Sequence, residues 1–214
     1  MSNLENKLKK IVNTFNNIDR NLAYEDIKKL STKYHKNINV LNVLSQIAQK
    51  MGDVDTTINS LKKILLIDKS NIECISKIYK LLLNKSLLDE ALANINLILR
   101  IDKDHYEAIR DKAYIYFLKN NFDKAKKYID NISKLEEKDF FAYNIKGLIY
   151  FKNSNFHEAK NYFEQAIKIN SKYVDSYNNL GICLLELEKL DEAYTVFKDA
   201  HEIESDNSKT IVNL

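Results

Sequence analysis

The sequence predicts an all-α protein, built as a solenoid of antiparallel helix hairpins. Three observations support this: the 214-residue chain has no proline and only three glycines, its apolar residues recur at helical spacing, and the pattern repeats every 34 residues. Sheet proteins with many turns need glycine and proline to reverse the chain, so this composition disfavours them. With 45% hydrophobic and 29% charged residues, the composition is that of a folded protein rather than a disordered one.

The second helix of each predicted hairpin carries the clearest period. A shift of 34 residues aligns a column of small residues: Ala91, Ala125, Ala159 and Ala193. Apolar columns follow four, seven and ten residues further on, and these spacings place the side chains on one face of a helix. The register extends upstream through Thr57 and, in degraded form, through Ala23.

A first helix precedes each of these helices. Its starts align at Leu41, Ile75, Ile109, Tyr143 and Tyr177. Between the two helices an apolar residue is usually followed by aspartate, at Asp55, Asp89, Asp123 and Asp191. We expect these aspartates to cap the second helix by accepting bonds from its first N–H groups, where their charge also suits the helix dipole.

The chain therefore divides into hairpins of 34 residues. Residues 1–37 form a degraded repeat, which we interpret as an N-terminal capping hairpin. Five regular repeats follow, at 38–71, 72–105, 106–139, 140–173 and 174–207. Residues 208–214 have the pattern of a further first helix that stops short, with Ile211 and Leu214 in apolar columns, so we expect the chain to be part of a longer protein.

This pattern resembles the tetratricopeptide repeat family over nearly the whole chain. In residues 140–173 the residues that carry the resemblance are Tyr143, Gly147, Tyr150, Phe156, Ala159, Phe163 and Ala166. The resemblance implies a right-handed superhelical solenoid, whose first helices line a concave groove that holds a partner. The family's proline near the end of each second helix is absent here, so polar stretches such as 68–71 and 170–172 are expected to end those helices.

Clustered reactive side chains are not expected. The four histidines fall in different repeats at unrelated positions, whereas a catalytic or metal site needs such residues to converge. Cys74 and Cys183 lie three repeats apart, and Cys183 has the surroundings of a small buried hydrophobe. We therefore predict no enzyme activity, no metal and no cofactor.

Charge and targeting signals narrow the partners. The net charge is +3, but residues 174–214 hold 3 basic and 9 acidic groups, so a basic body ends in an acidic segment. Only three of the 33 basic residues are arginines, which disfavours a nucleic-acid partner. The sequence has neither a signal-peptide core nor an apolar run that could span a membrane, so we expect no membrane association and a cytoplasmic location.

The first helices of the three C-terminal repeats hold the candidate site. Residues beside their packing positions are more apolar than a solvated face requires, which suggests a peptide-binding groove. The predicted groove residues are Arg110, Tyr114, Phe117, Phe141, Asn144, Leu148, Asn178 and Asn179. The alternative is that some of the aromatic side chains belong to the core between repeats, because groove and core positions are adjacent along the helix.

Two hypotheses of function follow, in different classes. The first is a non-enzymatic protein-interaction scaffold that holds a peptide or partner segment in the groove. The alternative is the N-terminal recruiting arm of a larger modular enzyme of the glycosyl- or sulfotransferase type, whose catalytic domain would follow Leu214. A third hypothesis is self-association through the C-terminal repeat.

Overall fold

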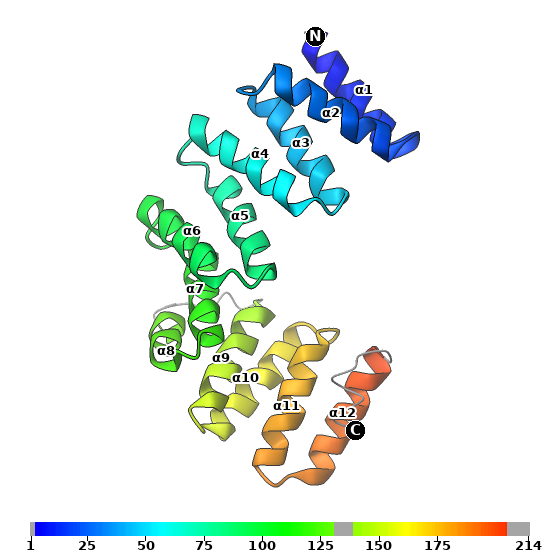
Figure 1. Ribbon diagram of the computed structural model, residues 1–214. Helices are drawn as coiled ribbons and strands as arrows, with labels where there is room; N and C mark the ends of the chain where they lie inside the picture. Colours follow the sequence, from blue (N-terminus) through cyan, green and yellow to red (C-terminus); the bar gives the residue numbers. More distant parts are fainter. Residues whose placement is uncertain (1–2, 131–138, 205–214) are drawn as a thin grey trace. The chain divides into compact units, whose positions relative to one another are not determined.

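The computed structural model describes residues 3–130 and 139–204, and these residues form twelve α-helices (Figure 1). The chain separates into two compact units, Met1–Lys103 (unit 1) and Asp104–Leu214 (unit 2). The helices of unit 1 are α1 (Asn3–Asn17), α2 (Arg20–Lys33), α3 (Ile38–Lys50), α4 (Val54–Ile67), α5 (Ile72–Asn84) and α6 (Leu88–Ile101). Those of unit 2 are α7 (Tyr106–Leu118), α8 (Phe122–Asp130), α9 (Phe140–Lys152), α10 (Phe156–Ile169), α11 (Val174–Glu186) and α12 (Leu190–Ile203).

Consecutive helices pack in pairs, and each pair packs on the next within its unit. Helix α2 contacts α3 and α4 contacts α5 in unit 1, while α8 contacts α9 and α10 contacts α11 in unit 2. The predicted all-α array of helix hairpins is thus confirmed, and twelve helices agree with about six repeats. The predicted helix start at 208–214 lies outside the described residues.

The small-residue column forms the contact between the two helices of a hairpin. Its members, from Ala23 and Thr57 to Ala193, are at most 1% exposed. Two glycines of the first helices allow a closer approach: a Cβ atom at Gly147 would lie 2.5 Å from Cε1 of Phe163, and Gly181 faces Phe197 in the same way. Bulk on one helix is therefore matched by its absence on the other.

Side-chain caps begin most of the first helices, and they form a column of their own. Backbone N–H groups three residues further on donate to Asn37, Asn71, His105 and Asp139, which are spaced by 34 residues. These bonds satisfy helix-start donors that have no partner inside the helix. The sequence analysis did not identify this column.

The prediction for the caps of the second helices was wrong. Helices α4, α6, α8 and α12 already begin at the apolar residue, so the predicted aspartates lie inside the first turn. There their charge still suits the helix dipole, but they are past the cap position. The side chains that cap α4 and α8 are those of Asp53 and Asn121.

Helices end in two different ways. The first helices are followed by one residue in the left-handed region, with φ of 77° at Gly52 and 57–59° at its counterparts Ser86, Asn120, Ser154 and Glu188. The second helices end as the polar stretches predicted. The N–H of Ser70 donates to Asp68, and that of Lys172 donates to Asn170.

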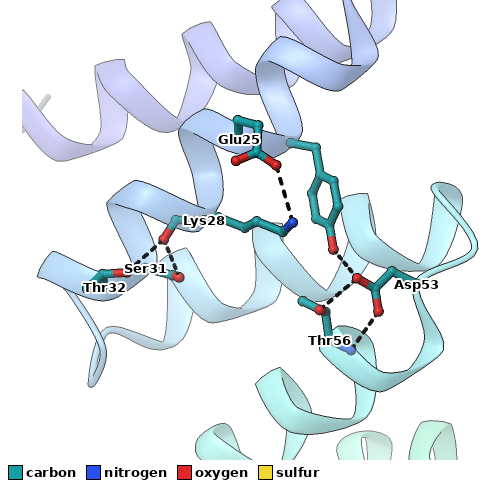
Figure 2. Close-up of polar contacts among 7 residues, drawn as sticks. Glu25, Lys28, Ser31, Thr32, Asp53 and Thr56 are labelled. Atoms are coloured by element: carbon teal, nitrogen blue, oxygen red, sulfur yellow. Dashed lines mark hydrogen bonds and ion pairs between the residues drawn. The ribbon is translucent and has the colours of Figure 1, made fainter.

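One side chain joins the first two hairpins of unit 1. The hydroxyl of Tyr24, on α2, donates to Oδ2 of Asp53 over 2.6 Å. Asp53 also accepts from the backbone N and the hydroxyl of Thr56, at 2.9 and 2.8 Å (Figure 2). The bond from Tyr24 and those from Thr56 lower the pKa of Asp53 to about 2, because they favour its charged form.

We predict that Gly147→Ala destabilises the protein by about 1–3 kcal/mol, because the new methyl group clashes with the buried ring of Phe163. The gain in helix propensity, about 1 kcal/mol, is too small to offset this. The double variant Gly147→Ala/Phe163→Ile recreates the pair found one repeat earlier, Ala113 and Ile129. Urea unfolding should show it to be more stable than the sum of the single changes; strict additivity would contradict the packing argument.

Tyr24→Phe should lower the free energy of unfolding at neutral pH by about 1–2 kcal/mol, since it removes a hydrogen bond to a charged group. Because the folded-state pKa of Asp53 lies below its ordinary 3.8, the stabilisation is present above that value and is lost as pH falls toward 2. The difference between wild type and variant should therefore shrink over this range. Chemical unfolding at several pH values measures it, with Tyr34→Phe as the control; a constant difference would argue against the Asp53 bond.

Candidate functional site

The predicted site residues lie on the three first helices of unit 2. Helix α7 contacts α9, and α9 contacts α11, so these helices are neighbours. We call the set of eight predicted residues the first-helix face. Six of them are half-buried: Arg110, Tyr114, Phe117, Phe141, Leu148 and Asn179. Asn144 and Asn178 are buried, each at 3% exposure.

The aromatic members of this face are in contact with one another. The ring of Tyr114 meets that of Phe141 edge-on, with centroids 5.4 Å apart, and lies nearly parallel to Phe117 at 6.5 Å. All three rings also pack against buried residues of the hairpin core. Both readings of the sequence therefore describe the same side chains, which have one side in the core and the other partly exposed.

Arg110 is held by two carboxylates. Its Nε donates to Asp111 over 2.8 Å and its Nη1 donates to Asp139 over 2.6 Å. The guanidinium carbon also lies 5.2 Å from the ring centroid of Phe141. Burial disfavours the charge of Arg110, but the two carboxylates outweigh this effect and raise its pKa. Since Asp139 caps α9, the arginine ties α7 to the start of the next hairpin.

Asn144 performs the same task between α9 and α11. Its Oδ1 accepts from the hydroxyl of Ser176 at 3.1 Å and from Nδ2 of Asn179 at 3.0 Å. A buried amide that is hydrogen-bonded in this way fixes its partners. Asn144 therefore orients the half-buried amide of Asn179.

Sequence reasoning missed Tyr173, which precedes α11. Its ring packs on Phe140 at 4.9 Å. Burial, together with Asp175 and the nearby Tyr114, raises the pKa of Tyr173. The signal was its position: it falls in the column of cap residues, where it makes no side-chain cap. An aromatic residue in a column of caps marks a side chain with another role.

Apolar exposure continues along α11. Ile182 is 38% exposed and Leu185 is 44% exposed. Their positions correspond, at the 34-residue spacing, to Leu148 and Phe151 on α9. The apolar columns of the first-helix face thus extend beyond the eight predicted residues.

Reactive groups offer little chemistry in the parts of the chain that the structure describes. Among these residues, His, Cys, Asp and Glu form no group of three that could hold a metal ion. Cys74 and Cys183 are buried, and burial raises the pKa of Cys183 to about 11, so its thiol stays protonated at neutral pH. No helix in residues 3–130 and 139–204 is long and apolar enough to cross a membrane.

Comparison with known proteins identifies the repeat. Residues 140–173 match one tetratricopeptide repeat model and residues 162–195 match another. None of the curated proteins matches the sequence.

Solved structures share the fold at low identity. A tetratricopeptide repeat protein from Parabacteroides merdae is 19% identical, with a TM-score of 0.81 over 98% of this chain and 83% of that one. PilW, described as a type IV pilus biogenesis factor, is 16% identical, with a TM-score of 0.75 over 99% of both chains. YrrB, described as having an unusual peptide-binding site, is 15% identical, with a TM-score of 0.62 over 87% and 96%.

Replacing Arg110 tests the polar link between α7 and α9. Arg110→Met keeps most of the apolar stem but leaves Asp111, which is 4% exposed, without its cation. We expect a loss of about 2–4 kcal/mol in the free energy of unfolding, because a buried carboxylate is left uncompensated. The matched control is Lys198→Met, which removes an exposed partner of Glu202 and should cost no more than about 0.5 kcal/mol. Equal losses in urea unfolding would rule out the buried network.

Proposed function

Because the chain belongs to the tetratricopeptide repeat family, we propose that it is a non-enzymatic protein-interaction module that holds a peptide segment of a partner on the first-helix face of unit 2. The observation that carries this proposal is the contact cluster of Tyr114, Phe117, Phe141 and Arg110, which is half-buried and fixed by its neighbours. Aromatic and arginine side chains in such surroundings supply much of the free energy of protein binding.

The aromatic rings are the anchors in this proposal. Tyr114 and Phe141 already pack on the core, so little side-chain freedom is lost when a partner covers them. Leu148 and Ile182 extend the apolar contact along α9 and α11. An extended segment laid across these helices would bury apolar side chains on the rings.

Asparagine supplies the polar contacts. Asn179 is half-buried and its amide is oriented by Asn144, so it is the member of the pair placed to bond a peptide backbone. Asn144 acts through Asn179, because its own oxygen already accepts two hydrogen bonds. Asn178, at 3% exposure, has a supporting position of the same kind.

Charge favours a basic partner segment. Around Arg110, the carboxylates of Glu107, Asp111 and Asp139 outnumber the single guanidinium. A peptide with a lysine or arginine beside an apolar residue therefore fits better than an acidic peptide. The peptide-binding site in the description of YrrB supports the class of partner, and the buried thiols Cys74 and Cys183 suit a reducing location such as the cytoplasm.

Selection from a random peptide library displayed on phage, followed by calorimetric titration of the selected peptides, tests this function. Phe141→Ala should weaken binding by about tenfold or more, because it removes a central anchor. Asn179→Ala should weaken it less.

Tyr162→Ala is the matched control, since Tyr162 is an aromatic residue on the second helix of the same hairpin and packs on Tyr150. Its binding should equal that of wild type. Unchanged affinity in both Phe141→Ala and Asn179→Ala would move the site elsewhere, and a library that yields no binder would refute the peptide-binding function.

A further inference from the structure

One position of the second helix contacts the next hairpin. It is occupied by Tyr24, whose hydroxyl reaches Asp53. In unit 2 it is occupied by Lys126, whose Nζ lies 4.9 Å from the ring centroid of Tyr150 in the following hairpin. Ile58 has the same position on α4 and is 7% exposed. A side chain at this position is therefore normally covered.

The same position on α12 is exposed. It holds Tyr194, which is 61% exposed, and one turn earlier Leu190 is 67% exposed. The residue that corresponds to Leu190 on α10 is Phe156, which is half-buried and packs against the core that α10 shares with α11. We call Leu190 and Tyr194 the α12 end face. It presents to solvent the apolar side chains that earlier hairpins place against a neighbour.

Acidic residues surround this face. Residues 174–204 hold eight acidic and two basic side chains. Both lysines are already paired: Lys189 with Glu192, and Lys198 with Glu202. Asp191 and Glu192 directly follow Leu190, so the apolar patch has an acidic border.

The first hairpin has the complementary chemistry. A cleft of about 340 Å³ lies between α1 and α2 and is lined by Lys7, Lys10, Ile11, Thr14, Asp26, Lys29, Leu30 and Lys33. All four lysines are exposed, while Ile11 is buried and Leu30 is half-buried. The cleft is thus apolar within and basic at its rim.

We propose that the chain associates with itself head to tail, with the α12 end face of one copy docked in the α1–α2 cleft of a second copy. Leu190 and Tyr194 would cover Ile11 and Leu30, while Asp191 and Glu192 meet the lysines of the rim. The two surfaces differ, so each added copy leaves one of each kind open, as in any heterologous contact. A tail-to-tail contact is disfavoured, because it would bring two acidic hairpins together.

This association does not use the first-helix face, so it stands or fails independently of peptide binding. Sedimentation equilibrium of the 214-residue protein should show a mass that rises with concentration and falls toward the monomer when salt is added, since salt screens exposed charges. Leu190→Lys/Tyr194→Lys blocks the tail and Lys10→Glu/Lys29→Glu blocks the head. Each variant alone should remain a monomer.

Mixing the two blocked variants gives the decisive measurement. The tail-blocked variant keeps an intact cleft and the head-blocked variant keeps an intact end face, so the mixture should form a discrete heterodimer and nothing larger. Leu66→Lys, at an apolar residue of α4 that is 78% exposed, is the control and should associate like wild type. The proposal is overturned by a wild type that is monomeric at every concentration, by a head-blocked variant that still associates, or by a mixture that stays monomeric.

Discussion

The close approach of two helices at a column of small residues is the constraint on which the rest of the structure depends. This contact occupies one face of each helix and recurs every 34 residues, from Ala23 to Ala193. Large side chains are admitted there only where the opposite helix gives way, as Gly147 does for Phe163. Because the buried face is the same in each repeat, the remaining faces are free to differ between hairpins, and the candidate surfaces lie on these faces.

Polar side chains make the connections between hairpins. Tyr24 reaches Asp53 in unit 1, whereas Arg110 reaches Asp139 and Asn144 accepts from Asn179 in unit 2. These bonds need specific partners, unlike apolar packing, so they fix how one hairpin sits on the next. In unit 2 the same residues border the aromatic rings. The groups that join the hairpins thus also shape the surface offered to a partner.

The fold could be predicted because two periods, 3.6 and 34, are both visible in the apolar and small residues. Local geometry was harder to predict. Asp55 failed as a cap because α4 already starts at Val54, a shift of two residues from the true cap at Asp53 that the apolar pattern does not resolve. Asn144 is buried for a similar reason: core and surface positions are adjacent on a helix, so only its bonds to Ser176 and Asn179 distinguish them.

The turns after the first helices have a consequence for how the sequence can change. Four of the five left-handed residues, from Ser86 to Glu188, carry a side chain in a conformation that costs about 1 kcal/mol relative to glycine. This strain lies at exposed turns, apart from the helix contacts and from the first-helix face. The protein therefore holds a reserve of stability that single substitutions could release. Such a reserve lets the binding surfaces accumulate destabilising changes without loss of the fold.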